Sequence, residues 1–268
     1  MSGELVLVGL GLYDEKDMSL RALETIREAD TVFAELYTSL MPAFHISKLE
    51  KLSKKNIIIV SRRDLEEEAG QEILDSAKNG KTVLLVPGDP LIATTHVDLR
   101  IRAEKQGIKT RIIHGASIIS AVIGLSGLQN YKYGRSVTVP FTDESSTVET
   151  PYRVIKENKR LGLHTLCFLD IKAEEKRYMT IQHGLKALLA MEKTKRNRVV
   201  NPSTLTVGIA RAGSNNPTVK ADYVADLINY DFGPPPHSLV FPGKLHFVEA
   251  EALVTLAGAP ENVKEMVK

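Results

Sequence analysis

The sequence predicts an α/β protein made of two domains with mostly parallel mixed sheets. Short apolar runs alternate with amphipathic stretches over most of the chain, which is the pattern of helices packed on a sheet. The 268 residues, 43% of them hydrophobic, suffice for one large domain or for two ordinary ones. A change of composition near the middle of the chain favours two.

The strands are predicted from short apolar runs that are bounded by turn-forming residues. In chain order they are Leu5–Val8, Thr31–Ala34, Asn56–Val60, Thr82–Val86, Thr110–Ile113, Ser136–Val139, Thr165–Leu169, Leu205–Ala210 and Ser238–Phe241. Several of them carry apolar residues at every position, so we expect helices to cover both faces of the sheet.

The helices are predicted where apolar residues recur at the 3.6-residue period. The predicted helices are Leu20–Arg27, Leu65–Ala77, Thr95–Gln106 and Tyr178–Lys195. Gly80 and Gly107 follow two of them and are typical of helix ends, because glycine accepts the left-handed backbone conformation found there.

The division between the domains is predicted from the stretch GLSGLQNYKYG, Gly124 to Gly134. Its three glycines, one asparagine and two tyrosines stand between a helix and the next strand, where a linker is expected. We therefore expect an N-terminal α/β domain at residues 1–124 and a C-terminal α/β domain at residues 125–268.

Charge and cysteine content exclude several classes of function. Thirty-five basic and 33 acidic residues leave a net charge of +2 with no basic stripe, so a nucleic-acid partner is not expected. Cys167, the only cysteine, precludes an internal disulfide, and it lies within an apolar strand as a buried structural thiol would. The apolar runs are too short to span a membrane. We expect a cytoplasmic protein.

Two loops that follow predicted strands are candidate ligand sites, because open α/β sheets bind ligands beyond the carboxyl ends of their strands. Gly9-Leu10-Gly11 follows the first strand, and Pro87-Gly88-Asp89-Pro90 follows the fourth. Glycine lets backbone amides approach a ligand closely, although a tight turn alone would also explain Gly9 and Gly11. Asp89 could accept hydrogen bonds from ribose hydroxyls or an amine, or it could simply be a turn or helix-capping residue.

Other familiar sites are missing from the sequence. The seven histidines show no helical zinc-binding pair, so we expect no metal site. There is no GxSxG elbow for a nucleophilic serine and no GxxxxGKS/T loop for a nucleoside triphosphate. Gly9, Gly11 and the distant acid Glu35 partly imitate a dinucleotide fingerprint. The third glycine of that fingerprint is replaced by Asp14, which argues against a nicotinamide-dependent oxidoreductase.

Longer motifs in both halves resemble a known family. VGLGLYDEKDMSLRALETIREADTVFAELYTS and PGDPLIATTH resemble the tetrapyrrole methylase superfamily. Within it, AELYTS, GLQNYKYG, GLHTLCFLDIK, RYMT and GPPPHSLVFPGKLHFVEAE resemble the archaeal type of the diphthine synthase family. The match extends over nearly the whole chain.

The resemblance implies a tetrapyrrole methylase-like homodimer that binds S-adenosyl-L-methionine in a cleft between its domains and releases S-adenosyl-L-homocysteine. The implied substrate is translation elongation factor 2, whose modified histidine carries a 3-amino-3-carboxypropyl group that would be trimethylated to diphthine. The family's cofactor contacts correspond here to Leu10, Asp89, Ile92, Ser117, Ile118, Leu169, Ala210 and His237. All but His237 lie in or beside loops at predicted carboxyl ends of strands.

The implied reaction needs no covalent enzyme intermediate, and the sequence identifies no catalytic residue. Two rival functions remain beside the oxidoreductase: a tetrapyrrole methylase acting on a porphyrin-like small molecule, and a cofactor-sensing module without activity. The polar loop from Phe141 to Pro151 is either a surface for the protein substrate or a solvated linker.

Overall fold

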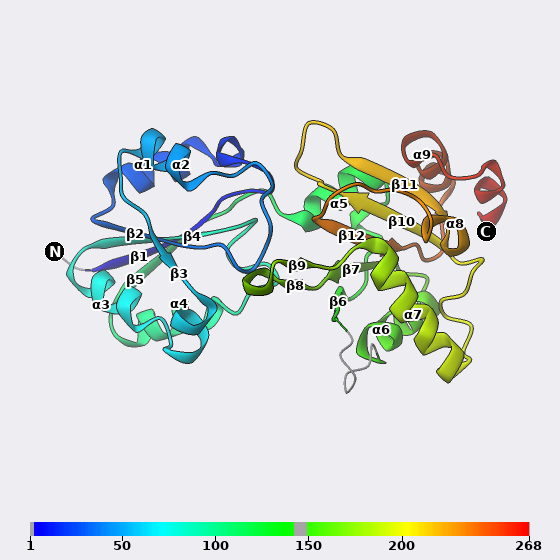
Figure 1. Ribbon diagram of the computed structural model, residues 1–268, viewed down its shortest axis with the longest axis horizontal. Coiled ribbons are helices and arrows are strands. Elements are labelled where there is room, and N and C mark those ends of the chain that lie inside the picture. The colour runs from blue at the N-terminus through cyan, green and yellow to red at the C-terminus, as the bar shows by residue number, and fades with distance from the viewer. Residues whose placement is uncertain (1–2, 142–148, 268) are drawn as a thin grey trace. The chain divides into compact units, whose positions relative to one another are not determined.

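The computed structural model describes residues 3–141 and 149–267 (Figure 1). Residues 142–148, which form most of the polar loop between Phe141 and Pro151, lie outside the described residues. The chain forms two compact units, Met1–Ile118 with Lys172–Lys176, and Ile119–Ile171 with Arg177–Lys268. The α/β fold class predicted from the sequence is confirmed.

The first unit contains a five-stranded sheet in which every neighbouring pair is parallel. The strand order is β3-β2-β4-β1-β5. The strands are β1 (Glu4–Gly9), β2 (Thr31–Glu35), β3 (Ile58–Val60), β4 (Lys81–Val86) and β5 (Lys109–Ile113). All five were predicted, and parallel pairing brings their carboxyl ends to one edge.

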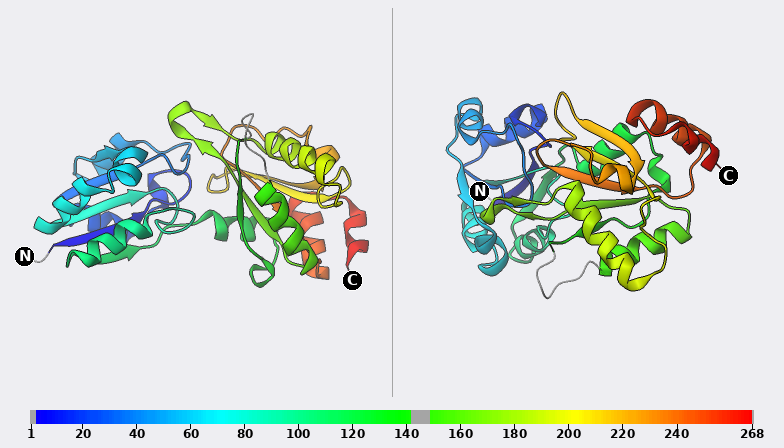
Figure 2. Two further views of the ribbon diagram at one scale, coloured as in Figure 1. Left: turned by 90° about the horizontal axis from the view of Figure 1, so that it is seen from below. Right: turned by 45° about the vertical axis from the view of Figure 1, so that its right-hand side comes forward.

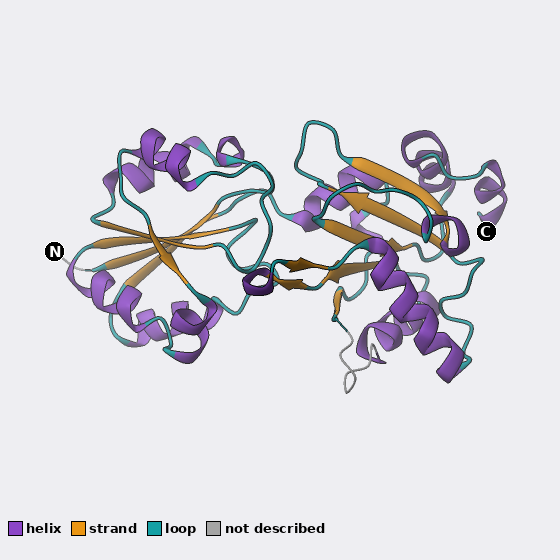
Figure 3. Cartoon of the chain, viewed as in Figure 1, coloured by secondary structure: helices purple, strands orange, loops and turns teal. Residues whose placement is uncertain are grey.

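Helices cover both faces of this sheet (Figure 3). Helices α1 (Leu20–Glu28) and α2 (Ile46–Ser53) share one core cluster with Val6 and Val8 of β1. Helices α3 (Gln71–Asn79) and α4 (Val97–Lys105) share the other, with Leu5 and Leu7 of the same strand. Consecutive side chains of β1 thus enter opposite cores, which explains why its sequence is apolar throughout.

The predicted helix at Leu65–Ala77 is interrupted in the structure. Residues Arg63–Glu67 form a π-helical turn, and α3 begins only at Gln71. Ala69 and Gly70 have φ angles of 59° and 65°, in the left-handed region, so a right-handed helix cannot pass through them. The apolar period continues across the break because both segments face the same core.

The second unit contains a five-stranded mixed sheet of order β11-β10-β12-β7-β6. The strands are β6 (Val137–Val139), β7 (Thr165–Leu169), β10 (Leu205–Ala210), β11 (Thr218–Tyr223) and β12 (His237–Phe241). The pairing of β6 with β7 is parallel, and the other neighbours are antiparallel. The first sheet therefore has the parallel arrangement expected from the sequence throughout, and the second sheet combines parallel and antiparallel pairs.

Helices also cover both faces of the second sheet. Helices α6 (Glu149–Arg160) and α7 (Ile181–Lys195) contribute to one core cluster with β7 and β12, and Figure 2 shows α9 (Phe247–Ala257) on the other side of the sheet. The second unit also contains most of α5 (Ile118–Ser126), α8 (Val224–Leu227) and the base of a hairpin of β8 (Ile171–Lys172) and β9 (Arg177–Tyr178), whose tip, Lys172–Lys176, belongs to the first unit. No helix among the described residues is long and apolar enough to cross a membrane.

The division between the units falls after Ile118, the first residue of α5, whereas the sequence suggested a division after Gly124. Packing explains why α5 belongs with the second unit. A Cβ atom on Gly127, just beyond α5, would lie 2.5 Å from Cβ of Ala252 in α9. The backbone N–H of Gln129 donates a hydrogen bond to Glu249 of the same helix.

Candidate functional site

The first group of candidate residues lies at the carboxyl edge of the parallel sheet. Leu10 follows β1, Asp89 follows β4, and Ser117 follows β5, and these three strands are neighbours in the sheet. The chain leaves β1 for the face covered by α1 and leaves β4 for the face covered by α4. Ligands of open α/β sheets bind at such a position, where the connections diverge.

Backbone hydrogen bonds hold two of these loops together. Gly11 N–H donates to the carbonyl oxygen of Gly88 at 3.2 Å, and Gly88 N–H donates to that of Gly11 at 2.6 Å. Leu10 N–H donates to the carbonyl oxygen of Val86 at 2.8 Å. The side chain of Leu10 is fully buried, so this residue can offer a ligand only its backbone.

Glycine is required where a third loop meets these two. A Cβ atom on Gly115 would lie 2.3 Å from the carbonyl oxygen of Gly88, and one on Gly9 would lie 2.5 Å from the nitrogen of Gly115. These contacts are far closer than real Cβ contacts, so any side chain would push the loops apart.

We therefore expect Gly115→Ala to lower the affinity for S-adenosyl-L-homocysteine at least about tenfold and to cost about 1 to 3 kcal/mol of stability, as overpacking does. The matched control is Gly124→Ala in α5, where an added Cβ meets no atom within 4 Å. This control should leave affinity unchanged and stabilise the helix slightly. Calorimetric binding and urea unfolding of both variants check the prediction, which equal affinities would contradict.

Asp89 is held at this edge by the turn that the sequence predicts. It is 7% exposed, and its Oδ1 accepts a hydrogen bond from Leu91 N–H at 3.2 Å. Its Oδ2 lies 2.6 Å from Nδ1 of His114. Helix α4 begins only at Val97, so Asp89 does not cap it, and the capping role considered for Asp89 is wrong.

His114 is a member of this group that the sequence reasoning missed. It directly follows β5, and its side chain is 73% exposed while its Nδ1 contacts the buried Asp89. The signal in the sequence is its position immediately after a predicted strand, which metal-binding spacing does not reveal. The remaining predicted residues of the first unit are Ile92, which is 38% exposed, and the partly buried Ser117 and Ile118.

The second group lies at one edge of the second sheet. Leu169 ends β7, Ala210 ends β10, and His237 begins β12, the antiparallel strand between them. Ala210 pairs directly with His237, and the next residue of β12, Ser238, pairs with Phe168. The antiparallel direction of β12 explains why His237, which was predicted before a strand, shares an edge with residues predicted after strands.

His237 is neutral and structurally engaged through both ring nitrogens. Ile181 N–H donates a hydrogen bond to its Nδ1 at 3.2 Å, so the ring proton resides on Nε2. Nε2 then donates to the carbonyl oxygens of Gly233 and Pro234, at 3.1 and 3.2 Å. Burial is the main reason why the pKa of His237 lies below its ordinary value. The imidazole thereby fixes the first turn of α7.

The oxidoreductase alternative is inconsistent with the environment of Glu35. Its side chain is fully buried, and its Oε2 accepts hydrogen bonds from the N–H groups of Tyr37 and Thr38. Its Oε1 accepts one from the Thr38 hydroxyl at 2.5 Å and lies 3.1 Å from Nε2 of His96. A carboxylate occupied in this way is not available to a ribose.

Metal binding and thiol chemistry have no site in the described part of the chain. No group of three or more histidine, cysteine, aspartate or glutamate side chains there could hold a metal ion. Cys167 is completely buried in β7, and burial raises the pKa of its thiol, which keeps it protonated and unreactive.

Comparisons with known proteins agree with the motifs in both halves. Residues 4–226 match the model of the tetrapyrrole (corrin/porphyrin) methylases. The chain is 52% identical over 266 residues to a diphthine synthase of Methanosarcina acetivorans, covering 97% of this chain and 98% of that protein.

A diphthine synthase of Methanocaldococcus jannaschii is 47% identical over 261 residues, covering 97% of this chain and all of the relative. A crystal structure of a diphthine synthase superimposes with a TM-score of 0.90 at 43% identity, covering 98% of this chain and 100% of the other. The chain is therefore a methyltransferase that belongs to the diphthine synthase family of the tetrapyrrole methylases.

Proposed function

We propose that this protein methylates the amino group of the 3-amino-3-carboxypropyl histidine of translation elongation factor 2, using S-adenosyl-L-methionine, and yields the trimethylated product diphthine. The observation that carries the proposal is the identity of about half of all residues to diphthine synthases over nearly the whole chain. Relatives with that name across the full length favour this substrate over a porphyrin-like ring.

The residues at the first sheet edge fit an adenosyl cofactor. Asp89 offers a carboxylate whose oxygens each have a second lone pair beyond the bonds to Leu91 and His114, which suits ribose hydroxyls. The neighbouring glycines keep side chains away from the loops where a nucleoside would approach. We assign Leu10, Asp89, Ile92, Ser117 and Ile118 to cofactor binding in the first unit, and Leu169, Ala210 and His237 in the second.

The chain's task in this reaction is positioning. Bound S-adenosyl-L-methionine would supply a methyl group already activated on its sulfonium. Backbone groups of Leu10 and the Asp89 carboxylate would fix the cofactor, so that the substrate amine lies in line at about 3 to 3.5 Å. A free α-amino group has a pKa of about 8, so a substantial minority is neutral at pH 7 and water can accept the proton. We assign no catalytic base.

The test is incubation with radiolabelled S-adenosyl-L-methionine and two forms of elongation factor 2, one carrying the 3-amino-3-carboxypropyl histidine and one unmodified. We expect label only on the modified form, and mass analysis of the histidine peptide should show a gain of up to three methyl groups. Cofactor binding without label on either form would contradict the substrate and favour a small-molecule methylase or a sensing role. We also propose a homodimer, which light scattering of the same preparation would test.

A further inference from the structure

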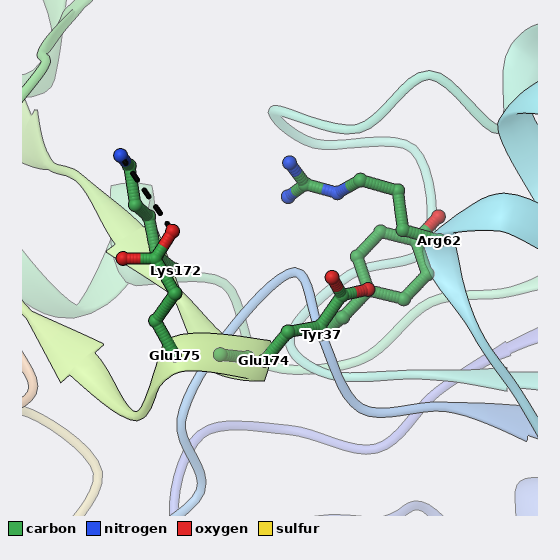
Figure 4. A pocket seen from close by; sticks show the side chains of 6 residues that line it. Tyr37, Arg62, Lys172, Glu174 and Glu175 are labelled. Carbon is green, nitrogen blue, oxygen red and sulfur yellow. Dashed lines mark ion pairs between the residues drawn. The ribbon is translucent and has the colours of Figure 1, made fainter.

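A pocket lies at the same sheet edge as Asp89, beyond the two remaining strands. Tyr37 follows β2 and Arg62 follows β3, and they line it together with Lys172, Ala173, Glu174 and Glu175 from the tip of the β8–β9 hairpin (Figure 4). All six residues belong to the first compact unit. The pocket's volume of about 160 Å³ is below the 300 to 1,000 Å³ typical of sites for drug-sized ligands. It therefore suits a small head group.

Arg62 is held in place without using its hydrogen-bond donors. Its guanidinium stands over the Tyr37 ring, 5.2 Å from the ring centre. No other described residue forms a hydrogen bond or an ion pair with it. A stacked guanidinium with free donors is arranged to bind a carboxylate through two parallel hydrogen bonds.

Tyr37 is a rigid platform for this arginine. Its side chain is buried, and its backbone N–H is fixed by the bond to Glu35. Burial, and next the charge of Glu35, raise the pKa of its hydroxyl, so the hydroxyl stays protonated. The hydroxyl oxygen is buried without a hydrogen-bond partner among the described residues. Such a group favours a ligand that can accept its proton.

The hairpin supplies the opposite charge. Glu174 lines the pocket and forms no ion pair with Arg62 or with any other described residue. Lys172 is engaged by Glu175 at 3.8 Å, as the dashed line in Figure 4 shows. A cation and an anion that share a pocket without pairing are complementary to a ligand that carries both charges, as an α-amino acid group does.

We propose that this Tyr37–Arg62 pocket binds an α-amino-acid head group, with the carboxylate on Arg62 and the amine towards Glu174, and that the group belongs to the protein substrate. The proposal rests on the proposed function, because the 3-amino-3-carboxypropyl group carries its carboxylate and its amine on one carbon. The cofactor's methionyl end has the same chemistry, and the experiment separates the two sources.

The experiment compares Arg62→Gln and Arg62→Lys with the control Arg63→Gln. The Arg63 side chain is 72% exposed and pairs with Glu67 and Glu68 outside the pocket. Three quantities are measured for each: the KM for modified elongation factor 2, the Kd for S-adenosyl-L-homocysteine and for 5′-methylthioadenosine, which lacks the amino acid, and binding of 2-aminobutyrate by ligand-observed NMR.

We expect Arg62→Gln to raise the KM for elongation factor 2 about tenfold or more, the loss expected when a charged hydrogen bond is removed, and to abolish 2-aminobutyrate binding. Arg62→Lys should recover part of this loss and Arg63→Gln should change nothing. The Kd values of both nucleosides should stay unchanged. Weaker binding of the homocysteine compound alone would instead assign the pocket to the cofactor's amino acid and overturn the substrate assignment.

If Arg62→Gln changes none of these quantities, the pocket does not bind an amino acid at all. The proposed function can fail separately. A wild-type protein that binds 2-aminobutyrate through Arg62 but does not methylate elongation factor 2 would support an amino-acid site in the pocket and contradict the proposed substrate.

Discussion

Asp89→Asn should weaken binding of S-adenosyl-L-homocysteine about a hundredfold while the protein stays folded. The buried carboxylate already satisfies Leu91 and His114, and its remaining lone pairs are those we assign to the ribose. An asparagine keeps the size but presents an NH2 group where one acceptor stood, so one ribose hydroxyl loses its acceptor and meets a donor. The lost bond, and the second bond that is now made to a neutral amide oxygen in place of a carboxylate, together account for the expected loss at about 1.5 kcal/mol each.

The control for this variant is Asp98→Asn in α4. Asp98 lies in the same unit, but its side chain is 62% exposed and pairs with the exposed Arg102. The charge change is identical, and the affinity should stay within a factor of two of wild type, as is usual for an exposed pair of little energy. Calorimetric titration of the three proteins with S-adenosyl-L-homocysteine tests this prediction. Equal losses of affinity in both variants would mean that the change in net charge, and not the Asp89 carboxylate itself, causes the effect.

The same variant separates cofactor binding from proton transfer. Single-turnover methylation measured at saturating cofactor should proceed at nearly the wild-type rate in Asp89→Asn. A rate that falls strongly at saturation would make Asp89 the base, against the assignment made above.

Glu249→Gln should destabilise the protein by about 3 kcal/mol or more. Glu249 is fully buried at the start of α9, where its two oxygens accept hydrogen bonds from the backbone N–H groups of Gln129 and His246. They also pair with the Lys132 ammonium and with Nε2 of His164. Removing one partner of a buried charge pair costs about 3 to 5 kcal/mol because the other charge stays desolvated.

The control is Glu251→Gln, two residues further along the same helix. Its side chain is 60% exposed and pairs with Lys264 at 3.1 Å. Exposed pairs contribute about 0 to 1 kcal/mol, so the urea midpoint of this variant should remain close to that of wild type. A similar midpoint for Glu249→Gln would mean that the buried cluster contributes little to stability.

The same cluster predicts the response to acid. Burial alone would raise the pKa of Glu249, but hydrogen bonds from Lys132, His246, Gln129 and His164 outweigh burial and lower it to about 2. In the unfolded chain a glutamate has a pKa of about 4.3. The stabilisation is therefore complete above pH 5 or so and declines as the pH falls towards about 2. Midpoints measured from pH 7 to pH 3 should fall less steeply in Glu249→Gln.

The first half of the fold could be read from the sequence because burial and periodicity agree there. The central strands β1, β2 and β4 are buried on both faces, so each appears as an apolar run such as Val83–Val86. The turn at Gly88 and Asp89 follows from residue chemistry alone. These features are local, and the candidate residues of the first unit lie in or beside the loops that follow the strands.

The parts that were not predicted depend on contacts between distant residues. Strand β11 carries a lysine and an aspartate among its six residues, and it becomes a strand by pairing with β10 at the edge of the sheet. Helix α7 begins at Ile181 rather than at Tyr178, because Tyr178 pairs in the hairpin and Thr180 caps the helix by accepting a hydrogen bond from His183 N–H. Neither strand pairing leaves a pattern in the local sequence, whereas the Thr180 cap is a local signal outside the apolar period.

The functional residues divide in the same way. The candidates Leu10, Asp89 and Ala210 stand at or just after the ends of predicted strands, so their position could be read from the sequence. His114 and Arg62 acquire their significance only from a partner elsewhere in the chain, Asp89 in one case and the Tyr37 ring in the other. A sequence search by spacing does not detect pairs separated by 25 residues.

Because its single cysteine is buried, the chain can be labelled selectively with spectroscopic probes at introduced cysteines. Cys167 lies inside a strand as a protonated thiol, so a thiol reagent that spares buried groups would leave the wild-type protein unmarked. The sequence also contains no tryptophan. One cysteine placed on an exposed surface of each unit would take a donor and an acceptor dye, and one tryptophan near the Asp89 loop would report locally. The motions of each unit during turnover could thus be followed without signal from other labelled thiols or from native tryptophan.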